Sequence, residues 1–200
     1  TGPDRQMGSL QALSRLVATG ADAVIVVAEH MKEKLPSSIE SFVIPSGLDL
    51  QLFRPTEKQI ARRRLGLPEA ERLVLFVGRP SQGRKRVHLA EQALEILNRS
   101  LPARLIVAWR VPHGDIPLYM SACDALVFTS MQEGSPKVVK EALACNLPIV
   151  SVPVGDVESR LKGVEGCELC TDDDPETIAS ALQRVLARGG RINGRQTVLA

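Results

Sequence analysis

At Glu133-Gly-Ser-Pro-Lys-Val-Val-Lys-Glu141 the chain places two carboxylates eight positions apart, around a predicted helix start. Ser135 suits the N-cap of that helix, and Pro136 suits its first turn, where the missing N–H of proline costs nothing. Free backbone N–H groups at a helix start form an anion site. A ligand with phosphates at this point and hydroxyl groups on either side could contact both carboxylates, and a nucleotide-sugar has that shape.

The residues on both sides of this segment complete a strand, a loop and a helix. Before it, Cys-Asp-Ala-Leu-Val-Phe-Thr-Ser at 123–130 predicts a buried strand that runs into a loop. After it, four apolar residues between 138 and 143 form a stripe at helical spacing. Asn-Leu-Pro at 146–148 then ends the helix.

Strands and helices alternate along the whole chain, which predicts an α/β fold with a Rossmann-like parallel sheet and helices on both faces. The strands are expected at 23–27, 41–44, 73–77, 105–108, 125–128, 149–152 and 167–170. The helices or helical turns are expected at 9–19, 30–35, 57–65, 88–100, 116–122, from 136 onward, at 157–162 and from a cap at Asp174 through 187.

Composition excludes several classes of partner. A net charge of +2 is too small to argue for nucleic acid, and an aromatic content of 3% provides no base-stacking platform. No apolar run approaches the roughly 20 residues that cross a bilayer. Four cysteines without a visible secretory signal predict reduced thiols in a cytoplasmic protein. For the C-x-x-C pair Cys167 and Cys170 we expect thiols around a strand, since no second close pair of zinc ligands is present.

A wider pattern surrounds the two carboxylates. It comprises Asp124, Thr129-Ser130, Glu133, Gly134, Glu141-Ala142, Ala144-Cys145, Pro148-Ile-Val150 and Gly155. This pattern resembles family 4 of the glycosyltransferases, whose signature is the E-x7-E spacing, and the likeness runs from about Asp22 to Arg195. Members are retaining enzymes with two Rossmann-like domains that face each other across a cleft. The resemblance implies transfer of a hexose-type sugar from a UDP- or GDP-sugar to a glycan or lipid-linked acceptor. It implies no cofactor and no metal, and it leaves peripheral association with a membrane open.

The resemblance also implies a division of the chain. In this family a Pro-x-Gly-x-Asp segment ends the acceptor domain, and the turn-rich stretch at 45–55 contains that segment. We expect a remnant of the N-terminal acceptor domain at 1–45, a linker at 46–55 and a donor-binding domain at 56–200. The connection at 109–115 is short, whereas many members place a helix and a strand there and use them to hold the nucleotide base.

The loop Phe76-Val-Gly-Arg-Pro-Ser-Gln-Gly-Arg-Lys-Arg86 follows a predicted strand and so faces the ligand edge of the sheet. The resemblance implies that Arg79 and Lys85 hold the donor diphosphate, and Arg84 could replace Lys85. Two cations against a diphosphate would neutralise the leaving group without a metal. A solvated basic loop is the alternative.

The remaining roles also come from the resemblance. Glu141 would accept hydrogen bonds from the ribose hydroxyls, and Glu133 would lie near the transferred sugar as a catalytic residue. Further donor contacts are expected at Gly78, Arg84, Gly134, Ser135, Pro136, Lys137 and Val138.

Four other features keep two interpretations each. Lys137 also suits a solvated helix face, and Gly155-Asp156 fits both a border of the sugar pocket and a plain turn. His113 is a candidate donor contact or a structural histidine, and 172–174 is better explained by helix capping than by a metal-binding D-x-D motif. Two other functions remain open as well. One is a non-catalytic nucleotide-sugar binding module, and the other is an epimerase or phosphorylase of similar fold.

Overall fold

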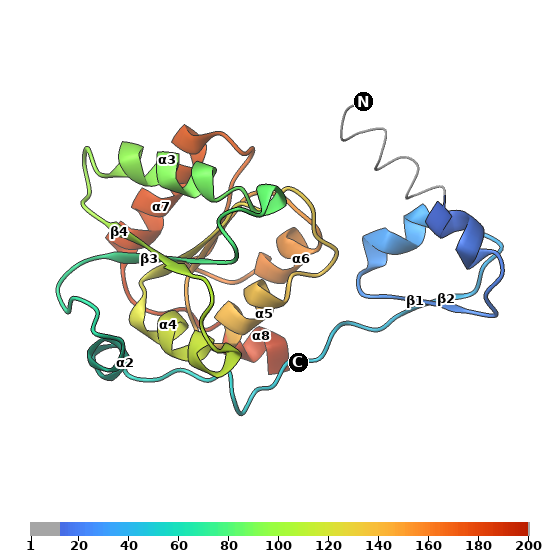
Figure 1. Ribbon diagram of the computed structural model, residues 1–200, viewed down its shortest axis with the longest axis horizontal. Helices are drawn as coiled ribbons and strands as arrows, with labels where there is room; N and C mark the ends of the chain where they lie inside the picture. The colour runs from blue at the N-terminus through green and yellow to red at the C-terminus, as the bar shows by residue number, and fades with distance from the viewer. Residues whose placement is uncertain (1–12, 200) are drawn as a thin grey trace. The chain divides into compact units, whose positions relative to one another are not determined.

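The computed structural model describes residues 13–199, and the chain divides into two compact units, Thr1–Gly47 and Leu48–Ala200 (Figure 1). In the first unit, residues 13–18 are helical, and β1 (Val24–Val26) pairs in parallel with β2 (Ser41–Val43). The short helix η1 (Glu29–Lys34) joins the two strands. The first expected helix is thus present from residue 13, and its residues 9–12 lie outside the described part of the chain.

The second unit contains a five-stranded sheet in the order β4-β3-β5-β6-β7, and all its pairings are parallel. The strands are β3 (Leu73–Val77), β4 (Arg104–Ala108), β5 (Ala125–Phe128), β6 (Ile149–Ser151) and β7 (Glu168–Leu169). Successive side chains of a strand point to opposite faces. Accordingly, Leu73 and Leu75 enter one apolar core, whereas Val74 and Phe76 enter the other.

Helices cover both faces of the sheet, which confirms the predicted Rossmann-like fold. Figure 1 shows α3 (Val87–Leu97) and α7 (Pro175–Arg188) on one side of the strands. On the other side lie α4 (Ile116–Ala122), α5 (Lys137–Ala144) and α8 (Arg195–Leu199). The unit also contains α2 (Lys58–Leu65), α6 (Val157–Leu161) and the short helices η2 (Gly83–Lys85) and η3 (His113–Asp115). Across residues 13–199, no helix combines the length and apolar character needed to cross a membrane.

The connection from β4 to α4 is as short as the sequence predicts. Only the single turn η3 lies within it. In the described sheet, β4 therefore has β3 as its one neighbour and forms an edge. The pairing of β4 with β3 runs to Ala108, so the next residues, Trp109 and Arg110, lie at the carboxyl edge of the sheet.

The expected linker at 46–55 requires a correction, because most of it packs on the second unit. Phe53 is 1% exposed and belongs to the core beneath α4 and α5. The Arg195 guanidinium donates to the carbonyls of Leu50 (2.7 Å) and Phe53 (2.5 Å). Turn-rich composition predicted a linker between the two domains. The apolar residues along this stretch attach it to the second unit from residue 48 onward. The roles assigned to the two units stay predictions.

A buried ionic group fixes the amino ends of β3 and β5. Arg62 is 1% exposed, and its guanidinium donates to the carbonyls of Ala122 (2.8 Å) and Pro68 (3.1 Å) and to Asp124 Oδ2 (2.9 Å). Asp124 Oδ2 also accepts from the backbone N–H of Leu73 at 2.7 Å. Asp124 thus fixes the start of β3, as the sequence suggests. It lies at the amino edge of the sheet, opposite the predicted site.

Candidate functional site

The carboxyl ends of β3 and β5 bring together the two loops that the sequence singles out. Backbone and hydroxyl groups of the loop after β5 bind the loop after β3. The N–H of Met131 donates to the Arg84 carbonyl at 2.8 Å, and the Thr129 hydroxyl donates to the Lys85 carbonyl at 2.9 Å. These bonds hold the basic loop against the turn that carries Glu133.

Lys85 and Glu133, both predicted to be catalytic, form an ion pair with 2.6 Å between Nζ and Oε1. Their side chains are 16% and 13% exposed, so solvent screens the pair only partly. Ser130 Oγ donates to the same carboxylate oxygen at 2.8 Å. Arg84 lies farther away, with 3.7 Å between Nη1 and Oε1, and its side chain is 48% exposed. The structure therefore favours Lys85 over Arg84 as the main cation beside Glu133.

Ser130 is a site residue to which sequence reasoning gave no role. It is 1% exposed, and its hydroxyl fixes the orientation of the Glu133 carboxylate. Its position three residues before the carboxylate, at the end of a buried strand, was the available signal.

Arg79 lies at the same edge of the sheet but stacks on an aromatic ring. Its guanidinium carbon is 4.8 Å from the ring centroid of Trp109, within the range of a cation–π contact. Trp109 is 37% exposed, and Arg110 approaches the same ring at 5.7 Å. Gly78 adopts φ +149°, and a Cβ built on it would lie 3.6 Å from the stem of Lys85. Gly78 thus lets the Lys85 side chain lie across the end of β3.

The start of α5 differs from the prediction. Pro136 occupies the N-cap position, the helix begins at Lys137, and no side chain caps it. Ser135 was expected to cap the helix, but its hydroxyl donates to Asp156 Oδ2 at 2.7 Å. This hydrogen bond holds the serine side chain toward the turn after β6, and its oxygen caps no N–H group of α5. The backbone N–H groups of the first turn consequently have no side-chain partner and keep their predicted capacity for an anion.

The turn at Gly134 is supported by a second turn that follows β6. The N–H of Asp156 donates to the Gly134 carbonyl at 3.1 Å. Gly155 has φ +59°, and a Cβ on it would lie 2.7 Å from that carbonyl oxygen and 3.0 Å from the Glu133 carbonyl oxygen. Only glycine fits this close approach without displacing the backbone.

Gly155→Ala is expected to destabilise the protein by about 2 kcal/mol, because the methyl group would meet backbone at a left-handed position. Urea unfolding measures this change. Gly83→Ala is the matched control, since a Cβ there meets nothing within 4 Å. Equal stability of the two variants would contradict the tight contact between the two turns.

Glu141 is a buried carboxylate, 7% exposed, on α5. Burial raises its pKa, and the nearby charges of His113, Lys137 and Lys140 partly oppose that rise. Burial of an acid costs folding free energy, which makes Glu141 a candidate binding group.

Two predicted donor contacts on α5 have different surroundings. Lys137 is exposed, whereas the side chain of Val138 packs in the apolar core. The predicted donor contact of Val138 therefore stays a prediction, made for its backbone N–H.

Of the remaining sequence candidates, the capping residues at 172–174 have a structural role, and His113 keeps both of its interpretations. Asp174 caps α7 by accepting from the N–H of Glu176 at 2.9 Å, and Asp173 pairs with Arg86, so capping is confirmed. The ring of His113 lies 5.3 Å from that of Phe53. All four cysteines are free thiols, and burial raises the pKa of Cys123 to about 12. No cluster of three or more side chains suited to a metal occurs in the described part of the chain.

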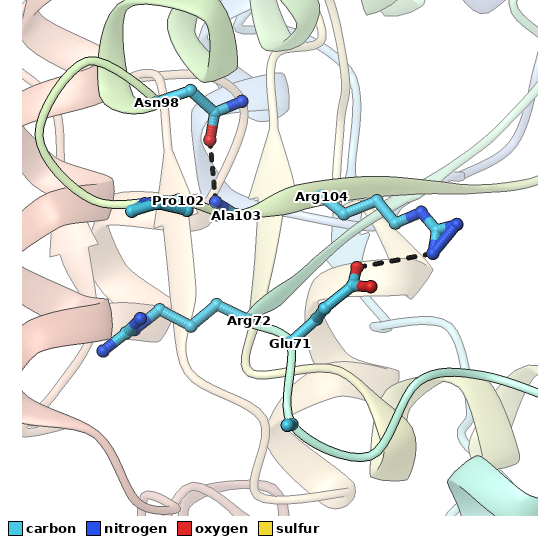
Figure 2. Close-up of a pocket in the computed structure, with 7 residues that line it drawn as sticks. Glu71, Arg72, Asn98, Pro102, Ala103 and Arg104 are labelled. Carbon is cyan, nitrogen blue, oxygen red and sulfur yellow. Dashed lines mark hydrogen bonds and ion pairs between the residues drawn. The ribbon is translucent and has the colours of Figure 1, made fainter.

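Figure 2 shows a cavity of about 470 Å³ at the opposite, amino edge of the sheet. Its lining includes Glu71 and Arg72 just before β3, and Asn98 and Arg104 around the start of β4. Two of its polar contacts are internal: Arg104 pairs with Glu71 at 3.3 Å, and Asn98 accepts from the N–H of Ala103 at 2.7 Å. This cavity contains none of the predicted site residues.

Comparisons with known proteins agree with the predicted fold and family. Residues 72–188 match the family described as Glycosyl transferases group 1. The chain is 33% identical to TuaC of Bacillus subtilis (strain 168), a glycosyltransferase named for teichuronic acid biosynthesis, over 91% of this chain and 51% of that protein. It is 30% identical to a D-inositol 3-phosphate glycosyltransferase of Geodermatophilus obscurus, over 87% of this chain and 46% of that protein.

A solved structure, sucrose-phosphate synthase from Thermosynechococcus elongatus, superposes with a TM-score of 0.78 at 25% identity. The match covers 96% of this chain and 57% of that one. The chain thus spans about half the length of the curated relatives it matches.

Proposed function

The chain belongs to the group 1 glycosyl transferases, and on that premise we propose that its second unit binds the donor of a retaining sugar transfer. The donor is a UDP- or GDP-linked hexose, held without a metal, and the acceptor is a glycan or a lipid-linked sugar. The name of TuaC refers to teichuronic acid biosynthesis, which supports an acceptor of the polysaccharide type. The protein works in the cytoplasm, with peripheral contact to a membrane where the acceptor is lipid-linked.

The observation that carries this proposal is the contact between Lys85 and Glu133. The two residues are 48 positions apart in the chain, yet their charged atoms are 2.6 Å apart at the ligand edge of the sheet. A cation suits the diphosphate, and a carboxylate suits hydroxyl groups or the positive charge that develops on a sugar ring. Their adjacency fits a ligand in which phosphate and sugar are joined by one bond.

The proposed chemistry retains the configuration at the anomeric carbon. The bond between the anomeric carbon and the diphosphate oxygen breaks, and the acceptor hydroxyl forms the new bond on the same face. The departing phosphate oxygen takes the proton of that hydroxyl, so no protein base is needed on the attacking side. Lys85 and Arg79 stabilise the charge that builds up on the diphosphate.

Glu141→Gln is expected to stabilise the fold at pH 7 and to weaken donor binding by about tenfold. Burial raises the folded-state pKa of Glu141 above its ordinary value of 4.5. The stability that its proton contributes is fully present below pH 4.5 and is lost as the pH rises through the folded pKa. A neutral amide avoids this loss but accepts weaker hydrogen bonds from ribose than a carboxylate does.

Thermal unfolding at pH 7 and at pH 4 checks the stability effect of Glu141→Gln. The gain in melting temperature should be present at pH 7 and nearly absent at pH 4, where both side chains are neutral. A lower melting temperature at pH 7 together with unchanged donor affinity would contradict a binding role.

Calorimetric titration of UDP-, GDP- and ADP-glucose into the chain tests the proposed function. We expect saturable binding of one donor and its loss in Arg79→Ala. If no donor binds at millimolar concentration, even after addition of the acceptor half of a relative, the proposal fails.

A non-catalytic binding module is a second candidate, because the chain spans about half the length of its relatives. A turnover assay distinguishes sugar transfer from binding alone. Binding without sugar release or transfer across a panel of acceptors, with the acceptor half supplied, would favour the binding module.

A further inference from the structure

The Ser135 hydroxyl has a fixed hydrogen-bonding direction. Its Oγ lies 2.7 Å from Asp156 Oδ2, and the same carboxylate oxygen receives the Nε–H of Arg160 at 3.0 Å. A carboxylate in an ion pair only accepts hydrogen bonds, so Ser135 must be the donor in this contact. A serine hydroxyl has a single proton. Toward any ligand, Ser135 therefore offers only lone pairs.

The turn after β6 holds Asp156, and with it the direction of the Ser135 hydrogen bond, in place. The Asp156 side chain is 10% exposed, and its own N–H donates to the Gly134 carbonyl at 3.1 Å. Gly155, the residue before it, lies against the carbonyls of Glu133 and Gly134. Asp156 is thus fixed through both its backbone and its side chain, while Ser135 itself stays half-buried and within reach of a ligand.

An acceptor at this position discriminates between the two parts of a nucleotide-sugar. Phosphate oxygens are also acceptors, and two acceptors do not bond each other. A sugar hydroxyl carries a proton that it can donate. Ser135 lies two residues after Glu133, in the same bend of the chain, so both residues border the position proposed for the sugar.

We propose that Ser135 accepts a hydrogen bond from one hydroxyl of the transferred sugar, and that Asp156 is the positioning residue that sets this direction. The inference rests on the proposed donor-binding function. The diphosphate is then held by Lys85, by Arg79 and by the backbone N–H groups at the start of α5. Ser135 selects for a hydroxyl on the sugar and makes no contact with phosphate.

Calorimetry with paired ligands tests this assignment. UDP, GDP and ADP are compared with UDP-glucose, GDP-glucose and ADP-glucose on the wild type, Ser135→Ala, Ser135→Thr and Asp156→Ala. Ser135→Ala is expected to weaken binding of the sugar conjugate about three- to tenfold and to change binding of the free diphosphate less than twofold. Ser135→Thr keeps the hydroxyl and should restore the affinity.

Asp156→Ala removes the acceptor and frees the serine proton, so it should produce the same selective loss, with no further loss in the double variant with Ser135→Ala. Glucose conjugates with single hydroxyls replaced by fluorine identify the hydroxyl, since fluorine cannot donate. One of them should bind equally to the wild type and to Ser135→Ala.

Equal weakening of the free diphosphate and its conjugate in Ser135→Ala would assign the contact to phosphate and overturn the inference. No weakening of either ligand would also overturn it. If the wild type binds none of the six ligands, the proposed function itself fails, and the inference fails with it.

Discussion

Lys85→Met is expected to weaken binding of the nucleotide-sugar by about 100-fold. The change removes the cation nearest to the predicted diphosphate position and leaves the Glu133 carboxylate, 13% exposed, without its closest ion-pair partner. The uncompensated carboxylate then repels the phosphates, so the loss exceeds that of one hydrogen bond. Calorimetric titration with the donor measures the change.

Arg84→Met is the matched control for Lys85→Met. Arg84 is the next residue along the same loop, but it lies 3.7 Å from Glu133 and is 48% exposed. Its loss should weaken donor binding less than about tenfold, as expected for a solvent-screened charge. In the double variant Lys85→Met, Glu133→Gln, part of the lost affinity should return, because the repelling charge is gone. Similar effects of Lys85→Met and Arg84→Met would contradict the role given to the Lys85–Glu133 pair.

Asp124→Leu is expected to destabilise the second unit by about 3–5 kcal/mol, a large share of the total stability of a domain. The substitution leaves the buried Arg62 guanidinium without its counterion and the Leu73 N–H without its acceptor. Lys58, which also pairs with Asp124, can turn to solvent, but Arg62 is 1% exposed and cannot. Urea unfolding followed by circular dichroism measures the loss.

The double variant Arg62→Met, Asp124→Leu removes both charges and should recover part of that stability. Glu71→Ala breaks an exposed ion pair with Arg104 and should cost less than about 1 kcal/mol. If Asp124→Leu lowers the free energy of unfolding no more than Glu71→Ala does, the buried Arg62–Asp124 pair does not hold the start of β3.

The strands and helices that border the site could be predicted because their signals are local. The apolar runs of β3 and β5 are bounded by polar or glycine residues, and the predicted limits at 73–77 and 125–128 match the structure. The capping signal at Asp174 also lies within three residues of the helix it begins, and its contact with Glu176 is present.

The start of α5 could not be predicted, because its geometry depends on a residue 21 positions away. Local rules make Ser135 a helix cap, but Asp156 returns beside it after β6 and holds the serine side chain by accepting a hydrogen bond from it. The same reason hides the role of Ser130, whose partner Glu133 is oriented only once Lys85 arrives from the loop after β3. For Phe53, turn composition predicted a linker, whereas burial against α4 and α5 decides its position. Contacts made by the fold outweighed local preference in each case.

Amide shifts in the NMR spectrum of the isotope-labelled chain, titrated with UDP-glucose and GDP-glucose, locate the donor site. Binding at the proposed site would move the amides of the loops after β3 and β5 and of the first turn of α5, including those of Lys85, Gly134 and Lys137. The amides around the cavity of Figure 2, at Arg72 and Arg104, would stay in place. Shifts centred on that cavity, or saturable binding that leaves the Gly134 turn unchanged, would contradict a donor site at the carboxyl edge of the sheet.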